Sequence, residues 1–167
     1  MAIYILCITS LLITALSLAP SFAHVLEAPP RLLVWSPELW RETTVFNGQF
    51  QLFAVVGAPI DLAAIVLTAG LTYVLRRERS AFRYSLAGTL LLLLALASWF
   101  AMVAPANAVL ATWKPGPVAP NFDAVRLRWE IGHMAVAALK ALALASTCLA
   151  ALAPRRPIST SQLSLKS

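Results

Sequence analysis

Two short segments of mirrored sequence hold the residues best suited to chemistry. Residues 24–27 (HVLE) and 130–133 (EIGH) contain both histidines of the chain and two of its seven acidic residues. A histidine and a glutamate three positions apart on a helix share one face, with Cβ atoms about 5–6 Å apart. If the two segments belong to neighbouring helices, these faces can converge into one site with four functional side chains.

Several kinds of chemistry fit this set. Two imidazoles and two carboxylates suit one iron, zinc, manganese or copper ion bound by His24, Glu27, Glu130 and His133, although cuprous ion prefers softer ligands. A dinuclear centre needs further glutamates from other helices. Three alternatives stay open. They are a haem with both histidines as axial ligands, a metal-free pocket in which His24, His133 and Glu130 perform acid–base catalysis, and a structural role at helix ends.

The composition predicts that these segments belong to a membrane protein. Hydrophobic residues form 60% of the chain and charged residues only 12%, which excludes an ordinary soluble domain. Backbone groups in lipid must be satisfied within their own segment, so apolar stretches of about 20 residues predict spanning helices. We predict an all-α bundle of four transmembrane helices in one domain (1–153), followed by a tail (154–167). The predicted spans are residues 3–23, 50–75, 82–104 and 129–153.

The first span resembles a signal peptide at one point. Residues 21–23 (SFA) fit a small-x-small cleavage site. The segment has no basic n-region, however. Its apolar run is also longer than the h-region of a signal peptide, which usually has about 7–15 residues. We therefore expect it to be retained as a helix that carries His24.

The basic residues predict the orientation of the bundle. They gather between the second and third spans and in the tail, so the positive-inside rule predicts that both termini are cytoplasmic. We expect a multi-pass protein of a bacterial inner membrane, in contact with the lipid bilayer, with the histidines on the periplasmic side. The net charge of +6 follows from this topology, and no nucleic-acid partner is indicated. The basic residues on the predicted cytoplasmic side are Arg76, Arg77, Arg79, Arg83, Arg155, Arg156 and Lys166.

Two long connections lie on the outer side. In the first, Pro29 and Pro30 are expected to end the first helix just after Glu27, because proline cannot continue a helix. Ser36 and Pro37 then predict the start of a short amphipathic helix. In the second connection, residues 121–123 (NFD) offer capping chemistry, and we expect the fourth helix to begin there.

Asp61 and Lys140 form a second constellation. Each lies about 16 Å below the outer end of its predicted span, at 1.5 Å per residue. Charges at such depth normally face the interior of a bundle and pair with one another. The matching depths predict an intramembrane ion pair between the second and fourth helices. A polar column that leads inward from His133 is the functional alternative.

Asn107 and two tryptophans are candidate substrate-binding residues. Asn107 follows Pro105 at the outer end of the third span, where its amide can either terminate a helix or orient a ligand. All five tryptophans lie towards the outer side, where such rings anchor a protein at the membrane interface. Trp113 and Trp129 can instead line the mouth of a pocket.

At these positions the chain resembles the anthrone-oxygenase-like family of small four-helix membrane proteins. The resemblance rests on residues 24–29, on residues 105–108 followed by Trp113, and on residues 128–130 with His133. Fungal members are associated with dioxygen-dependent oxidation of anthrones to anthraquinones. The resemblance implies that the site is lined by His24, Glu27, Asn107, Trp129, Glu130 and His133. The family often has a basic residue about one turn after the last histidine. Here that region holds Val136 and Ala137.

These observations favour an oxidoreductase that acts on a membrane-soluble aromatic or quinone-like substrate at the histidine site. One alternative is a non-catalytic accessory subunit that packs against a membrane-protein partner or a second copy, since small residues in the spans permit close helix contacts. A small carrier is the third hypothesis. It would depend on Asp61 and Lys140, but the sequence lacks the internal repeat common in transporters.

Overall fold

The computed structural model describes residues 1–47 and 49–154, and for residues 49–52 and 54 only the backbone. The predicted tail and its basic residues lie outside this range, apart from Pro154. The described part consists of helices joined by short connections and one longer loop. The elements are α1 (Ala2–Leu33), α2 (Pro37–Arg41), η1 (Glu42–Phe46), α3 (Gln49–Val74), α4 (Arg79–Ser98), η2 (Trp99–Val103), α5 (Ala104–Leu110) and α6 (Phe122–Leu152), with η1 and η2 in π-helical conformation.

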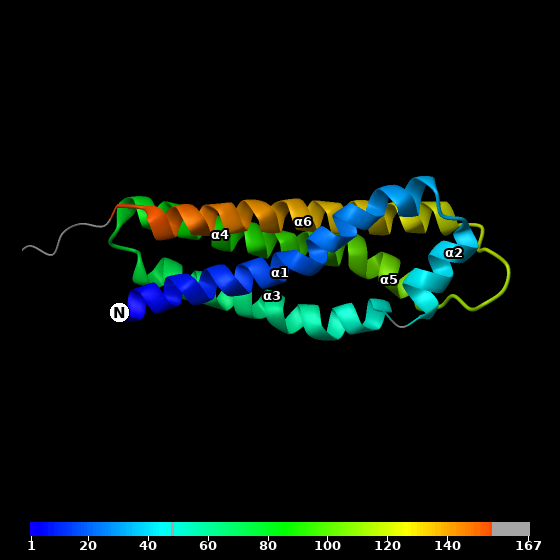
Figure 1. Cartoon of the computed structure of the whole chain (residues 1–167), viewed down its shortest axis with the longest axis horizontal. Coiled ribbons are helices and arrows are strands. Elements are labelled where there is room, and N and C mark those ends of the chain that lie inside the picture. Colours follow the sequence, from blue (N-terminus) through cyan, green and yellow to red (C-terminus); the bar gives the residue numbers. More distant parts are fainter. Residues whose placement is uncertain (48, 155–167) are drawn as a thin grey trace, which may run out of the picture.

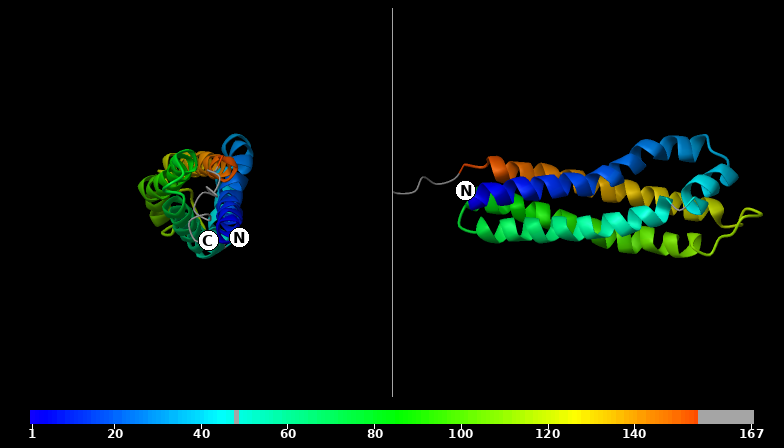
Figure 2. Two further views of the ribbon diagram at one scale, coloured as in Figure 1. Left: turned by 90° about the vertical axis from the view of Figure 1, so that its left-hand side faces the viewer. Right: turned by 60° about the horizontal axis from the view of Figure 1, so that its bottom comes forward.

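Four helical stretches are long and apolar enough to cross a membrane, which confirms the predicted class of helical membrane protein. They are α1, residues 55–74 of α3, the third stretch from Arg79 to Leu110, and α6. Each long helix packs against two others, in the ring order α1, α3, α4, α6. Figure 2 shows this ring end-on. The N-terminus, the end of α6 and the α3–α4 turn lie at one end of the bundle (Figure 1), which we call the terminal end. The opposite end, with α2, η1 and α5, is the cap end.

The prediction that α1 ends after Glu27 is wrong. The helix continues through Pro29 and Pro30 to Leu33, and the N–H groups of Val34 and Trp35 bond to the carbonyl of Pro30. Both prolines lie on the exposed side of α1, so their rings meet no packed neighbour. The extra turns extend the buried side of the helix by two positions.

The buried side of α1 is a stripe of small and polar residues at alternating spacings of three and four. Such spacing keeps one face of a helix turned to its neighbours, and small residues allow close approach in a membrane. His24 and Arg31 lie on this stripe, two turns apart. Its members are Cys7, Ser10, Thr14, Ser17, Ser21, His24, Ala28 and Arg31.

An aromatic cluster closes the cap end. As predicted, a short helix begins after Ser36, whose Oγ accepts a hydrogen bond from the Leu39 N–H at 3.3 Å, and α6 begins at Phe122. Helix α2 delivers Trp40 to the centre of the cap, where its side chain is completely buried. We call the buried residues Trp40, Val103, Ala106, Leu110, Phe122 and Trp129 the cap cluster.

The third span changes its helical form where it meets α6. Helix α4 passes into η2 at Trp99, and a π-helical turn rotates the residues that follow relative to an α-helix. Gly132 makes this contact possible, because a Cβ atom there would lie 2.8 Å from Cγ2 of Val103 and 3.1 Å from Cβ of Met102. The close approach sets α5, and with it Asn107, beside the histidines.

Candidate functional site

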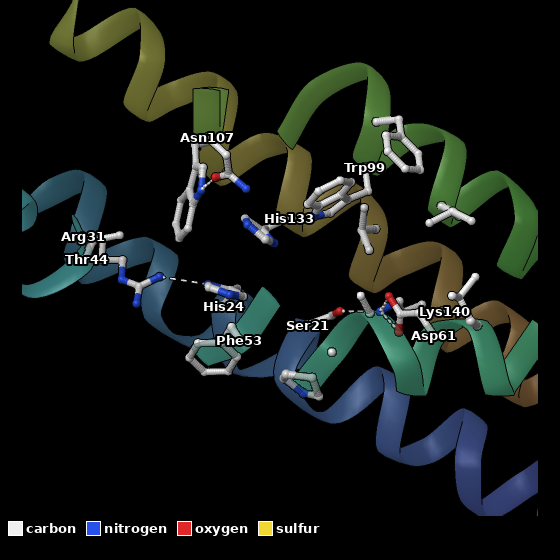
Figure 3. A pocket seen from close by; sticks show the side chains of 18 residues that line it. Ser21, His24, Arg31, Thr44, Phe53, Asp61, Trp99, Asn107, His133 and Lys140 are labelled. Atoms are coloured by element: carbon white, nitrogen blue, oxygen red, sulfur yellow. Dashed lines mark hydrogen bonds and ion pairs between the residues drawn. The ribbon is translucent and has the colours of Figure 1, made fainter. Parts of the chain in front are cut away.

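A cavity of about 260 Å³ lies between the long helices, towards the cap end. Helix α1 contributes both a histidine and an arginine to its wall, and α6 contributes a histidine and a lysine. Figure 3 shows how the labelled side chains face the cavity from opposite helices. The lining residues are Pro20, Ser21, His24, Arg31, Thr44, Phe53, Gly57, Ala58, Asp61, Leu62, Leu96, Trp99, Phe100, Asn107, Trp129, His133, Val136 and Lys140.

The two histidines meet in this cavity. Their imidazole rings stack with centroids 4.1 Å apart and planes inclined by 22°. The indole of Trp129 stands edge-on to both, with its centroid 5.0 Å from that of His24 and 4.4 Å from that of His133. The sequence therefore predicted correctly that the two segments face each other. The contact is between ring faces.

Arg31 sets the protonation of His24. Its Nη1 lies 3.1 Å from Nδ1 of His24, and Nη2 forms an ion pair with Glu27. A guanidinium group only donates hydrogen bonds and stays charged in proteins, so Nδ1 of His24 must be the acceptor. We infer this tautomer from the bonding partner. His24 is therefore the neutral imidazole with its proton on Nε2, and it can donate one hydrogen bond.

His133 is different, because no described residue forms a hydrogen bond with its ring. Its imidazole stacks on that of His24 and lies edge-on to the indole of Trp129. A neutral imidazole has one nitrogen that accepts and one that donates. His133 can therefore offer a free lone pair to a molecule in the cavity, whereas Nδ1 of His24 cannot.

The two glutamates do not join the histidines. The side chain of Glu27 is 47% exposed and is held by Arg31. Glu130 is completely buried, and its Oε1 accepts a hydrogen bond from Nε1 of Trp40 at 3.0 Å. Positions three apart differ in direction by about 60° on a helix of 3.6 residues per turn. On α6 this difference directs Glu130 to the cap and His133 to the cavity, so neither glutamate lines the cavity.

The predicted four-ligand metal site does not fit this arrangement. Within the described residues, no group of three or more histidine, cysteine, aspartate and glutamate side chains is placed to hold a metal ion. The lone pairs of stacked imidazoles lie in two nearly parallel planes, so they do not converge on one point. In addition, Nδ1 of His24 already accepts the hydrogen bond from Arg31. Axial haem ligation needs two histidines that approach the iron from opposite sides. Metal and haem binding therefore stay predictions.

A buried ion pair forms the floor of the cavity. Nζ of Lys140 lies 2.7 and 2.9 Å from the two carboxylate oxygens of Asp61, as the matching depths predicted. It also lies 3.1 Å from Oγ of Ser21 and 3.1 Å from the carbonyl oxygen of Ser17. The Ser17 hydroxyl donates to Asp61 at 2.6 Å. These bonds join α1, α3 and α6 at one level, so the pair has a clear structural role.

Asn107 and Trp129 line the cavity near its cap end, as the sequence predicted, but Trp113 does not. Nε1 of Trp129 donates to Oδ1 of Asn107 at 2.8 Å. An indole can only donate, which fixes the amide oxygen towards Trp129. Figure 3 shows the amide nitrogen directed away from the indole, towards His133. Trp113 packs instead against the cap cluster, with its ring centroid 5.7 Å from that of Phe122.

Several lining residues were not predicted. Arg31 was not predicted, because Pro29 and Pro30 predict an end of the first helix before it. The spacing of seven residues from His24 was the signal that places both on one face. Thr44 of η1 is buried and its hydroxyl has no hydrogen-bond partner among the described residues. Trp99 lines the cavity from the π-helical turn, and Phe53 lines it from the start of α3. No sequence pattern predicted either position.

Comparisons with models of known protein families, with curated proteins and with solved structures return no match to this chain.

Proposed function

We propose that this chain is a membrane oxidoreductase that binds a planar, weakly acidic aromatic molecule between the long helices and removes a proton from it. The observation that carries the proposal is the unequal pair of stacked imidazoles in an otherwise largely apolar cavity. His133 has a free lone pair and acts as the general base. His24 donates from Nε2 to the oxygen on which negative charge develops.

The surroundings of the two rings support this division of roles. A general base must lie within hydrogen-bond reach of the proton that it takes. Hydrogen-bond donors that are already in place stabilise developing charge more effectively in a cavity that excludes water. The amide nitrogen of Asn107 provides a second donor, and the guanidinium of Arg31 is held behind His24.

The size and walls of the cavity suit a flat ligand. Its volume of about 260 Å³ is slightly below the range of about 300–1,000 Å³ that is usual for drug-sized ligands. Aromatic side chains line it from three elements, namely Phe53 of α3, Trp99 of η2 and Trp129 of α6. Aromatic rings favour offset-stacked or edge-on contacts with another ring. A compact molecule of two or three fused rings matches these walls.

The oxidation step follows the resemblance to the anthrone-oxygenase-like family. An anthrone has an acidic CH₂ group beside a conjugated ring system. His133 takes one proton from this carbon, and the negative charge is delocalised onto the carbonyl oxygen of the anthrone, which faces His24. Dioxygen is the oxidant. The CH₂ carbon becomes a carbonyl carbon, its second hydrogen is lost, one oxygen atom is retained, and the other leaves as water.

The test is oxidation of anthrone by the purified protein in lipid nanodiscs. Formation of anthraquinone is followed by absorbance, and consumption of dioxygen by an electrode, with equal amounts expected. His133→Phe keeps the ring stack but removes the base, and we expect it to lower the rate by about a hundredfold or more, the usual contribution of a general base. Trp113→Phe changes a ring outside the cavity and serves as the matched control.

Equal rates for wild type, His133→Phe and empty nanodiscs would rule out the proposed enzyme. That result would favour the accessory subunit, for which neither histidine needs to be intact.

A further inference from the structure

Described side chains lie across the cavity at both of its ends along the bundle. Towards the cap end, the cap cluster lies over it, with Trp40 and Trp129 buried and their rings edge-on at 5.6 Å. Towards the terminal end, Asp61 and Lys140 form the floor. A small void of about 10 Å³ lies on the other side of this pair, beside Ser17 and Leu92. A ligand of several rings would therefore meet described side chains at both of these ends.

The side of the cavity between α3 and η2 is different. Three residues that line the cavity there are exposed on the outer surface of the bundle, namely Ala58 and Leu62 of α3 and Phe100 of η2. Leu62 is 56% exposed and Phe100 is 61% exposed. All three lie in stretches that are long and apolar enough to cross a membrane, so we expect this surface to meet hydrocarbon. We call this part of the cavity wall the lateral opening.

The packing of the helices explains the lateral opening. Helix α3 packs along α1 and α4, whereas η2 packs against α6, α5 and the end of α4. Gly132 allows η2 to pack closely against α6. Gly57 of α3 lines the cavity at this level, and a Cβ atom there would meet nothing within 4 Å. The absence of a side chain leaves space at the entrance.

Polarity changes across the cavity in the same direction. The two imidazoles lie on the side away from the opening, where α1 and α6 bring His24 and His133 together. The opening itself is lined by Gly57, Leu62 and Phe100. A molecule that fits this gradient has a polar aromatic head and an apolar chain.

We infer that the ligand enters sideways from the bilayer through the lateral opening, and that it carries an alkyl or prenyl chain that remains in the opening and reaches the lipid. This inference rests on the proposed function and specifies its substrate class further. The head occupies the cavity beside the histidines. The chain lies between α3 and η2 and stays within hydrocarbon, so only the head leaves the lipid during binding.

The test uses photolabelling in phosphatidylcholine nanodiscs. The probe is para-nitrophenol with an alkyl chain that carries a diazirine close to the ring, where the chain would lie in the opening, and unsubstituted para-nitrophenol is the competitor. We expect labelled peptides to come from residues 55–62 of α3 or 96–100 of α4 and η2, and excess competitor to suppress the labelling. Labels on residues 36–46 or 111–121 would overturn the inference, because they would place the chain at the cap.

Two tryptophan variants on the same helix provide a matched pair. Gly57→Trp fills the lateral opening, whereas Gly70→Trp adds the same ring at a position that is also open but does not line the cavity. We expect Gly57→Trp to reduce labelling at least tenfold, about 1.4 kcal/mol of binding free energy, and Gly70→Trp to match wild type. Equal labelling of both variants would contradict the lateral route.

The competitor separates failure of this inference from failure of the proposed function. Para-nitrophenol without a chain should bind wild type and lose affinity in His133→Phe, whatever route it takes. If it does so while the chain labels the cap, the lateral route is wrong and the histidine site stands. If it neither binds nor competes, the site itself is wrong.

Discussion

The imidazole of His24 stacks on that of His133 at a centroid distance of 4.1 Å, and only His24 is held by a hydrogen bond from Arg31, at 3.1 Å. Two residues of the same type in one cavity therefore have different chemical roles. The arginine engages the lone pair of Nδ1 on His24 and leaves a donor on Nε2. His133 keeps an accepting nitrogen for the ligand. The predictions below follow from this asymmetry and from the packing that maintains it.

Replacing Arg31 by methionine should allow His24 to exchange between its two neutral tautomers. The guanidinium holds the proton on Nε2, and without it the neutral ring exchanges between its two tautomers. We expect ¹⁵N NMR of histidine-labelled protein to show one protonated and one unprotonated ring nitrogen for His24, with averaged shifts in Arg31→Met. The spectrum is recorded in a His133→Phe background, which leaves His24 as the single histidine.

Arg31→Lys is the matched control for charge, because it keeps a cation but loses the planar group that reaches both Glu27 and His24. Identical ring shifts in wild type and Arg31→Met would show that the arginine does not set the tautomer.

Glu130→Gln should leave anthrone oxidation within about twofold of wild type, because Glu130 does not line the cavity. The amide oxygen of glutamine still accepts the Trp40 hydrogen bond, and such a bond contributes about 1 kcal/mol. A metal ligand or a catalytic acid would not tolerate the change. The rate of anthraquinone formation is measured for Glu130→Gln beside His133→Phe, and a similar large loss in both would restore Glu130 to the catalytic machinery.

A double-mutant cycle on stability should show strong coupling between Asp61 and Lys140. Removing one partner leaves an unpaired charge in the bundle interior, which costs about 3–5 kcal/mol. We expect Asp61→Leu and Lys140→Met each to lower the unfolding midpoint in detergent, and the double variant to recover most of the loss. Additive losses in the double variant would mean that the two side chains do not act as a pair.

Gly132→Ala should weaken ligand binding by moving η2. The added Cβ atom would lie 2.8 Å from Cγ2 of Val103, so the Val103 side chain or η2 itself must shift. Overpacking of this kind typically costs about 1–3 kcal/mol. The measurement is the affinity for para-nitrophenol together with thermal stability. Gly70→Ala, which has open space around it, is the control, and equal behaviour of the two variants would show that the close contact is unimportant.

Much of the fold was predictable because membrane helices are marked by length and composition alone. The apolar runs predicted four helices, and the matching depths of Asp61 and Lys140 predicted their contact. The caps at Ser36 and Asn121 predicted the starts of α2 and α6. The end of α1 was predicted wrongly, because proline rings on the outer side of a helix do not disturb its buried face. The spacing of seven residues between His24 and Arg31 indicates that both lie on one face of a continuous helix.

The site was predictable only in part, since spacing along one helix does not give the direction of each side chain in a bundle. His24 and His133 converge as predicted, but Glu27 turns to Arg31 and Glu130 to Trp40. Those partners come from a proline-containing turn and from a separate short helix. The π-helical turn at Trp99 also has no sequence signature, although it brings Asn107 into the site.

The most direct test of the account is the absorption spectrum of para-nitrophenol bound to the purified protein. The probe is neutral and nearly colourless at mildly acidic pH, and its anion is yellow. The account predicts that wild type and Trp113→Phe turn the bound probe yellow, because His133 accepts the phenol proton and His24 donates to the phenolate oxygen, while His133→Phe does not. Bound probe with the same spectrum in wild type and His133→Phe would contradict the central claim that His133 is the proton acceptor.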